Sequence, residues 1–234
     1  AGTLVASQVC ATAVCAIVGG LLLNSLVALI SVPKGFEVSN ILTMDVELAG
    51  PGYAGRRLPF ERSLLENVRH IPGVAAVGLS SQQLLAGTGM NLRVVADGTS
   101  VPIMERPLAN FRSVNPEFFR TFGIAVRRGQ VFADADTRPV AVVSEATAAR
   151  LWPGENPIGK RLRRGPESSP PIEVVGVAGD VRASRLEQPG GLIVYLPYWQ
   201  APPAQFSIAV RVSGNAGAVA TAIRDTLRRL DPSL

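Results

Sequence analysis

The class of this protein is decided by its first 33 residues, AGTLVASQVCATAVCAIVGGLLLNSLVALISVP (residues 1–33), which contain no Asp, Glu, Lys, Arg or His. Residues 9–30 form a stretch of 22 mostly apolar residues, of which 11 are Val, Ile or Leu. As an α-helix this stretch would be about 33 Å long, which matches the hydrocarbon thickness of a bilayer. The sequence therefore predicts a transmembrane helix within residues 1–33, with the lipid bilayer as a partner.

A cleaved signal peptide is the alternative interpretation of this stretch. Signal peptides have an apolar region of about 7–15 residues that follows a basic start. Here the apolar region is longer, and no basic residue precedes it. The pattern favours a helix that stays in the membrane.

Small residues recur every four positions along the predicted helix, at Ser7, Ala11, Cys15 and Gly19. Such a stripe lets helices approach closely in lipid, although small residues are common in membrane helices generally. The pair Cys10 and Cys15 has no neighbouring His or carboxylate and is a poor metal site. We predict no disulfide in the rest of the chain, because it contains no other cysteine.

The composition of the whole chain argues against disorder and against nucleic-acid binding. Of the 234 residues, 47% are hydrophobic and 18% charged, which is enough for a sizeable core. The net charge of +5 comes from scattered arginines, and the one dense basic run is residues 160–164. No zinc-finger spacing or aromatic RNA-binding strand accompanies that run. We therefore expect no nucleic-acid partner.

The residues after the membrane segment begin with a β-α-β pattern. Residues 41–48 alternate between apolar and polar and predict a half-buried strand. A helix is expected to begin at Pro59 and to end at Pro72-Gly73, and residues 74–79 predict a second strand.

The chain ends with a strand and a helix of the same kind. Residues 206–212 predict a strand, Gly214-Asn215 a turn, and residues 219–230 an amphipathic helix. This strand and helix could return to pair with the first β-α-β pattern.

The middle of the chain is less regular. Residues 84–112 look rich in loops, with one strand near 92–95. Asn115 is predicted to cap a short helix that has Pro116 in its first turn and ends at Gly123.

Further elements follow in this middle part. Residues 140–143 predict a strand that leads into a helix at 145–151, capped by Ser144, and residues 158–162 look strand-like. Strands are also expected at 172–177 and 192–196.

Together these elements predict an α+β fold in which one N-terminal transmembrane helix is followed by an α/β layer. The predicted domains are the helix (1–33), the α/β layer in two parts (34–104 and 205–234), and an inserted mixed α/β subdomain (105–204) that interrupts it.

No motif predicts catalysis, a cofactor or a metal ion. Residues 154–161, GENPIGKR, approach the nucleotide-binding P-loop, but Arg161 stands where the P-loop needs a hydroxyl for Mg²⁺. The predicted helix lies before this loop and the strand after it, which inverts the required order. We therefore expect no ATP site here.

Isolated titratable residues have simpler explanations. His70, the only histidine, lies at a predicted helix end just before a Pro-Gly stop, where a positive charge is favourable. The acid pairs Asp134 with Asp136, and Glu173 with Asp180, read as exposed turn acids with no basic or nucleophilic partner. We predict no catalytic residue and no enzyme activity.

Five segments in order resemble the MacB-like periplasmic core domain of FtsX-type ABC permeases. They are residues 7–9, 19–25, 33–36 and 40–43 of the N-terminal part; 72–74; 114–124, 128–132 and Asp136; 140–145 and 152–161; and 174–181 with 195–197. The overall pattern is most similar to the duplicated orphan-permease branch of that family. Residues 115–119 and 152–160 carry much of this pattern, and turn and packing roles explain most of it.

The resemblance implies a cytoplasmic N-terminus and a domain on the periplasmic side of the cell inner membrane. It implies that the α/β layer of residues 34–104 and 205–234 is a porter-like subdomain. It also implies a separate ABC ATPase subunit or domain, a second permease copy or internal duplication, a periplasmic adaptor as a further partner, and more membrane helices after residue 234. The implied function is to transmit or gate conformational change driven by that ATPase, in efflux or envelope processes. The alternative is a single-pass anchored sensor or adaptor domain without a transport partner.

Overall fold

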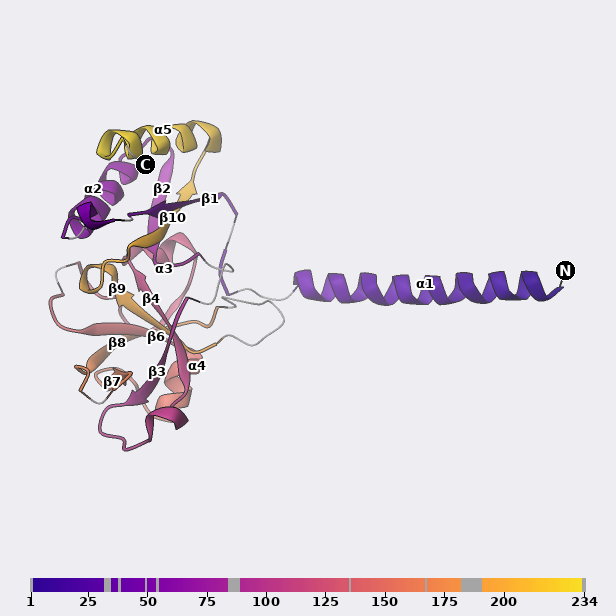
Figure 1. The fold of residues 1–234 in the computed structure, drawn as a ribbon, viewed down its shortest axis with the longest axis horizontal. Coiled ribbons are helices and arrows are strands. Elements are labelled where there is room, and N and C mark those ends of the chain that lie inside the picture. Colours follow the sequence, from indigo (N-terminus) through magenta and orange to yellow (C-terminus); the bar gives the residue numbers. More distant parts are fainter. Residues whose placement is uncertain are drawn as a thin grey trace. The chain divides into compact units, whose positions relative to one another are not determined.

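The computed structural model describes residues 2–31, 35–37, 39–48, 50–53, 55–83, 89–134, 136–166, 168–181 and 191–232. The chain divides into two compact units, residues 1–34 and 35–234, and each is described by itself (Figure 1).

The first unit is one long helix, α1 (Gly2–Ser31). Its described side chains are exposed, including Val14, Ile17, Leu21 and Leu22. This confirms the helix predicted over residues 9–30. In the part of the chain that the structure describes, no helix reaches the combined length and apolar character of a membrane span, so the predicted crossing is not confirmed.

The second unit begins and ends with one layer, which we call the split lobe. It contains β1 (Ile41–Glu47), the 3₁₀ turn η1 (Pro51–Tyr53), α2 (Arg57–Arg69), β2 (Val74–Ser80), β10 (Gln205–Val212) and α5 (Ala216–Leu230). Strand β10 lies between β1 and β2 and is antiparallel to both. The predicted return of the terminal strand and helix is therefore confirmed.

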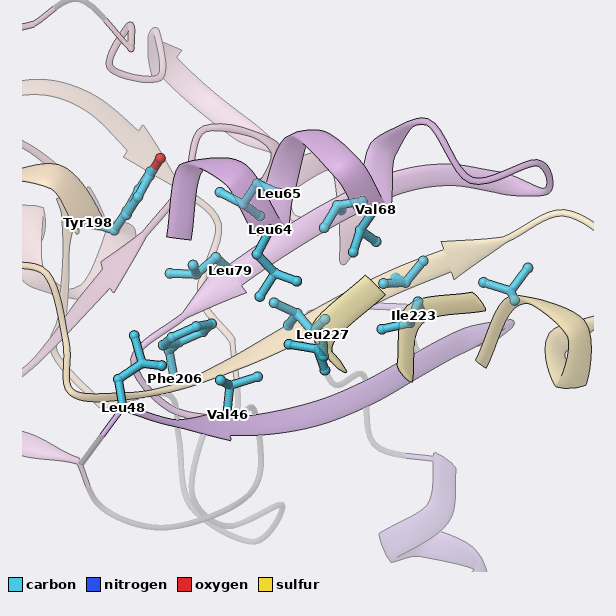
Figure 2. Close-up of a cluster of buried hydrophobic side chains, with 14 of the residues drawn as sticks. Val46, Leu48, Leu64, Leu65, Val68, Leu79, Tyr198, Phe206, Ile223 and Leu227 are labelled. Carbon is cyan, nitrogen blue, oxygen red and sulfur yellow. The ribbon is translucent and has the colours of Figure 1, made fainter. Parts of the chain in front are cut away.

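Side-chain alternation explains how the split lobe closes. The even-numbered residues of β1, Leu42, Met44 and Val46, face the helices, together with Leu48. They meet apolar residues of α2 and α5 in one buried cluster, which includes Leu64, Leu65, Val68, Leu79, Phe206, Ile223 and Leu227 (Figure 2). Burial of this apolar surface holds both helices on one face of the sheet.

The second layer, the ring lobe, is built from residues between β2 and β10. Its elements are β3 (Met90–Ala96), η2 (Ile103–Glu105), β4 (Leu108–Val114), α3 (Glu117–Thr121), β5 (Val126–Gly129), β6 (Val140–Ser144), α4 (Glu145–Leu151), β7 (Arg161–Arg164), β8 (Ile172–Ala178), β9 (Ile193–Pro197) and η3 (Tyr198–Gln200).

Six of these strands close on themselves. Their pairing runs β4-β3-β7-β8-β6-β9, and β9 pairs again with β4 in parallel. One apolar cluster receives side chains from all six strands, among them Val94, Phe111, Leu162, Val174 and Val194, with Val143 from β6. The cluster therefore fills the inside of the ring, and Trp152 at the end of α4 joins it.

A second cluster lies on the other side of the ring strands and is aromatic. Phe118 and Phe119 of α3 pack on Tyr195 of β9 with ring centroids 5.9 and 5.0 Å apart. Phe132 continues the cluster to Trp199 at 5.6 Å.

Two predictions about the middle of the chain were wrong. The loop-rich stretch 84–112 contains most of β4, whose residues Ala109 and Phe111 point into the ring. Asn115 does not cap α3, because the N-cap is Pro116 and no side chain caps the helix. The tertiary role of Asn115, described below, outweighs its local capping preference.

The other predicted elements are present, with small shifts. The helix expected from Pro59 begins at Arg57, and the strand expected at 158–162 begins at Arg161. Ser144 caps α4 as predicted, its hydroxyl accepting from the Thr147 amide at 3.3 Å. Part of the predicted loop, residues 84–88, lies outside the described residues.

Candidate functional site

One hollow of the second unit lies where the two lobes meet. Its volume is about 690 Å³. One wall comes from α2 and the other from the start of α3 and from η3; the lining residues are Arg62, Leu65, Glu66, Arg69, His70, Asn115, Pro116, Glu117, Asp134, Tyr198 and Trp199. We call it the seam groove.

A second hollow of about 680 Å³ continues from the seam groove along the ring lobe. The two share Arg62, Asp134 and Trp199, and the second adds residues such as Arg164 and Leu196. Both have an aromatic and apolar floor under a rim of mixed charge. Such a surface suits binding, because binding sites combine apolar area with a few placed polar groups.

The aromatic floor is fixed by hydrogen bonds and ring packing. The Trp199 indole donates to the Asp136 carbonyl at 2.9 Å. Tyr198 packs edge-on against Trp199 with centroids 5.4 Å apart. Burial raises the pKa of the Tyr198 phenol, against the opposing effect of the Arg62 guanidinium beside it. The phenol therefore stays neutral and acts as a hydrogen-bonding group.

The seam is bridged by one ion pair near the groove. Arg69 of α2 lies 3.3 Å from a carboxylate oxygen of Glu117 on α3. Arg120 reaches the other oxygen of the same carboxylate at 3.4 Å. Both pairs are partly exposed, so they contribute little to stability.

The stronger link across the seam is Asn115, a buried residue between β4 and α3. Its amide donates to the Val77 carbonyl at 2.8 Å, and its carbonyl oxygen accepts from the Leu79 amide at 2.8 Å. Because both partners belong to β2, one ring-lobe side chain is fastened to the backbone of the split lobe.

Close packing reinforces this link. A Cβ at Gly78 would lie 3.2 Å from the Cα of Phe118 and from the Cβ of Thr121, so the missing side chain lets α3 lie directly on β2. Further along, the Arg211 guanidinium of β10 donates to the Thr121 carbonyl at 3.0 Å. We call the set of Gly78, Asn115, Thr121 and Arg211 the seam joint.

Glu61, next to Arg62 on α2, is fully buried. Within the described part of the chain, neither carboxylate oxygen has a hydrogen-bond partner. Desolvation raises the pKa of Glu61 to about 8, against the opposing charge of Arg57. The side chain is therefore largely protonated at neutral pH.

The ring lobe contains a buried charge of the opposite sign. Arg112 on β4 is 1% exposed, and its Nε donates to the Asn110 side chain at 2.8 Å. Among the described residues, its Nη1 has no partner, and neither has the hydroxyl of Tyr195 opposite it on β9. Burial raises the pKa of Tyr195 to about 12 and lowers that of Arg112.

The residues weighed from the sequence do not assemble into a reactive site. His70 follows the last residue of α2, at the helix end where the sequence predicts it, with Nδ1 2.7 Å from the Glu66 carbonyl. Asp136 accepts from the Ala133 amide, and Glu173 pairs with Arg138 at 2.9 Å. The described residues include no group of three or more His, Cys, Asp or Glu that could hold a metal ion.

The near-P-loop also has a structural explanation. Lys160, the would-be phosphate ligand, is paired with Glu155. The Gly159 amide donates to the Val174 carbonyl at 2.8 Å, which ties the turn to β8. The helix before it and the strand after it are α4 and β7, the inverted order that the sequence predicts.

The sequence analysis missed Glu61, Arg112 and Trp199. One signal was present for Glu61: it precedes Leu64, Leu65 and Val68 at helical spacing, on the apolar face of α2. Arg112 had no comparable signal, because its strand was not recognised.

Comparison with known proteins agrees with this architecture. The model of the MacB-like periplasmic core domain matches residues 5–230. No curated protein matches significantly.

Three solved structures are similar in fold. The periplasmic region of MacB from Actinobacillus actinomycetemcomitans has a TM-score of 0.55 at 18% identity, over 87% of this chain and 89% of that one. The extracellular domain of the noncanonic ABC-type transporter YknZ from Gram-positive bacteria has a TM-score of 0.53 at 16% identity, over 83% and 94%. A domain of a putative permease from Porphyromonas gingivalis has 0.52 at 19%, over 73% and 69%. From the family match over almost its whole length, the chain belongs to the MacB-like periplasmic core domain family.

Proposed function

We propose that this chain is the extracytoplasmic part of an ABC transporter permease and that it transmits or gates conformational change driven by a separate ATPase. Family membership supports the transporter class. The proposed partners are an ABC ATPase subunit or domain, a second permease copy and a periplasmic adaptor. In the proposed division, residues 34–104 and 205–234 form the porter-like subdomain, and residues 105–204 form the inserted subdomain.

The observation that carries the proposal is the seam joint. A domain that transmits motion needs two bodies and a firm connection at one place, so that displacement of one body moves the other. Asn115 supplies that connection with two buried hydrogen bonds to β2. The seam groove, by contrast, is a hollow bridged by the partly exposed pair of Arg69 and Glu117, and a change in its width is the motion that the proposal requires.

Membrane attachment through the N-terminal segment is part of the proposal. Its support is the absence of charged residues from residues 1–33 and the exposed apolar side chains of α1. Cysteines placed at the exposed positions Ser100 and Ser168 test the location of the domain. Labelling by a membrane-impermeant reagent in intact cells is expected, and labelling only after lysis would contradict the proposal.

The test of transmission is a reversible cross-link across the seam groove. Arg69→Cys and Glu117→Cys are introduced into full-length permease in which Cys10 and Cys15 are serine, and are joined by a short bis-methanethiosulfonate. With the permease reconstituted together with its ATPase, we expect the cross-link to lower ATP turnover several-fold and reduction to restore it. An unchanged rate of ATP turnover in fully cross-linked permease would contradict transmission through this domain.

The matched control keeps the cross-link within one lobe. Ser63→Cys and Asn67→Cys lie one turn apart on α2 and are treated with the same reagent. This pair should leave ATP turnover unchanged. An equal loss with both pairs would assign the effect to the reagent or to α2 alone.

A further inference from the structure

The split lobe has an open sheet edge at β1. In the sheet order, β1 comes first and pairs only with β10 among the strands that the structure describes. The six ring strands, in contrast, each have neighbours on both sides because the ring is closed. An open edge presents unpaired backbone groups and can accept another strand.

The register shows which backbone groups of β1 point outward. The Leu48 amide donates to the Ala204 carbonyl at 2.7 Å, and the Val212 amide donates to the Asn40 carbonyl at 2.8 Å. The register between these two pairs is unbroken, so even-numbered residues of β1 bond to β10. The amides and carbonyls of Thr43, Asp45 and Glu47 therefore face away from the sheet, at positions where all three residues are exposed.

A groove runs beside this edge on the helix side. Its volume is about 390 Å³. Met44 and Val46 of β1 and Leu227 of α5 give it an apolar base, and Arg224 and Arg228 stand on its helix wall. Asp45 and Glu47 also line it, but as odd-numbered residues of β1 they direct their side chains to the other face of the sheet, where Asp45 accepts from Gln83 and Ser207. An incoming strand would place alternate side chains into this groove while its backbone bonds to β1.

The charges decide which strand fits. The two arginines face the side chains that a strand would place on the helix side, and the pair that Arg228 makes with Asp225 among the described residues is a distant one, at 4.0 Å. Two copies of β1 paired about a two-fold axis would bring four arginines to the same face. A second copy is therefore disfavoured, and acidic side chains are favoured.

We propose that the β1 edge binds an extended segment of another protein by strand addition, with apolar and acidic residues alternating on its helix-facing side. The apolar residues pack on Met44 and Leu227, and the acidic residues pair with Arg224 and Arg228. This site is separate from the seam groove and does not depend on the proposed transport function.

The probe is a fluorescent nine-residue peptide in which threonine alternates with valine and glutamate, so that valine and glutamate share one face. Binding to the whole chain in detergent is followed by anisotropy at low salt. We expect saturable binding, and about tenfold weaker binding of the same peptide with lysine for glutamate. Equal binding of both peptides would overturn the proposed charge selection.

Two variants separate backbone pairing from charge. Thr43→Pro removes an outward N–H without touching the bonds to β10, as proline allows on an edge strand. It should abolish binding while circular dichroism stays unchanged. The double change Arg224→Glu with Arg228→Glu should reverse the preference towards the lysine peptide.

Hydrogen exchange supplies a readout that does not depend on the folding of a variant. Peptide binding should slow exchange of the Thr43, Asp45 and Glu47 amides and leave the already bonded Met44 and Val46 amides unaffected. Binding without protection of the outward amides would overturn strand addition. Self-association of the chain through β1, detected as a Thr43→Cys disulfide dimer, would replace the proposed partner with a second copy.

Discussion

The split lobe and the ring lobe cover their apolar sheet faces in different ways. Both bury an apolar sheet face, but the ring lobe closes its strands on themselves, whereas the split lobe covers its sheet with α2 and α5 and leaves β1 at an edge. Closing the ring leaves its strands without an edge of unpaired backbone N–H and C=O groups, and it restricts how far the strands can shift after a mutation. An edge keeps both a binding surface and freedom for helices to move. The comparison shows that the closed ring leaves no edge among its six strands, whereas the split lobe leaves the β1 edge on which the proposed strand addition rests.

The two lobes also differ in how they accommodate a buried charge. Glu61 in the split lobe avoids the free-energy cost of a buried negative charge by binding a proton. With a pKa of about 8, its carboxyl is largely protonated at neutral pH. Arg112 in the ring lobe has no such escape, because a guanidinium stays protonated in proteins. It is held instead by Asn110. The split lobe is therefore the part of the molecule in which a buried carboxyl should make stability respond to pH near neutrality.

The largest expected effect comes from a matched pair of core truncations, Leu162→Ala in the ring and Leu64→Ala on α2. Both leucines are 0% exposed. Leu→Ala in a core costs about 3–5 kcal/mol, more where the site cannot collapse. We expect about 4–5 kcal/mol for Leu162, which strands surround, and about 3 kcal/mol for Leu64, because α2 can move towards the sheet. Urea unfolding measures the loss in the free energy of unfolding for each variant. A larger loss for Leu64→Ala than for Leu162→Ala would contradict the view that the ring relaxes less than the split lobe.

The pH dependence of stability tests the difference between the buried Glu61 of the split lobe and the buried Arg112 of the ring lobe. The pKa of Glu61 is raised from its ordinary value of 4.5 to about 8 in the folded protein. Between these values the folded state keeps a proton that the unfolded state releases, so stability is full below pH 4.5 and falls as pH rises to 8. Glu61→Gln should remove this slope and raise the free energy of unfolding at pH 8 by about 4 kcal/mol.

The control for this measurement is Glu66→Gln, an exposed position on the same helix. It should leave the pH profile of urea unfolding as in the unmodified chain. A Glu61→Gln variant that still loses stability between pH 5 and 8 would show that the pH response arises elsewhere.

The smallest effect compares two helix caps. Asn215 caps α5 at the exposed end of the split lobe, accepting from Gly217 and Ala218. Ser144 caps α4 inside the ring lobe, where its hydroxyl also accepts from the Ile193 amide at 3.2 Å. Cap loss costs about 1 kcal/mol at an exposed helix end. The Ile193 amide keeps Thr147 Oγ1 at 2.8 Å, but the buried Thr147 amide loses its acceptor, which adds to the cost. Thermal unfolding should show about 1 kcal/mol for Asn215→Ala and about 2 kcal/mol for Ser144→Ala; equal losses would contradict the difference in burial.

Regular patterns in the sequence were enough to predict the split lobe. Alternation in residues 41–48 and the helical spacing of Leu64 and Val68 place apolar side chains on one face, and the structure uses these faces. The ring lobe was harder to predict from the sequence. Its strand β4 points Ala109 and Phe111 into the ring, but its opposite face carries the polar Asn110 and Arg112, and Arg112 is buried as well, so burial does not follow the apolar residues. A strand buried on both faces need not show the simple two-residue period.

The candidate site was less predictable than the fold, because it depends on partners far apart in the chain. Asn115 looks like a helix cap when only its neighbours are considered, since a short polar side chain precedes Pro116 and Glu117. In the folded chain its amide group satisfies the backbone of β2, 36 and 38 residues away. Local preference was outweighed by two buried hydrogen bonds.

By itself, the sequence determined the apolar N-terminal helix, the capped helix α4 and the alternating strands of the split lobe, because these follow from composition and from periods of 2 and 3.6 residues within one segment. Only the tertiary structure decided that the ring closes between β4 and β9, that Asn115 joins the lobes, and that β1 is left at an edge. These features depend on which segments meet in space. Many pairings satisfy the same local pattern, and the shared burial of side chains selects one of them.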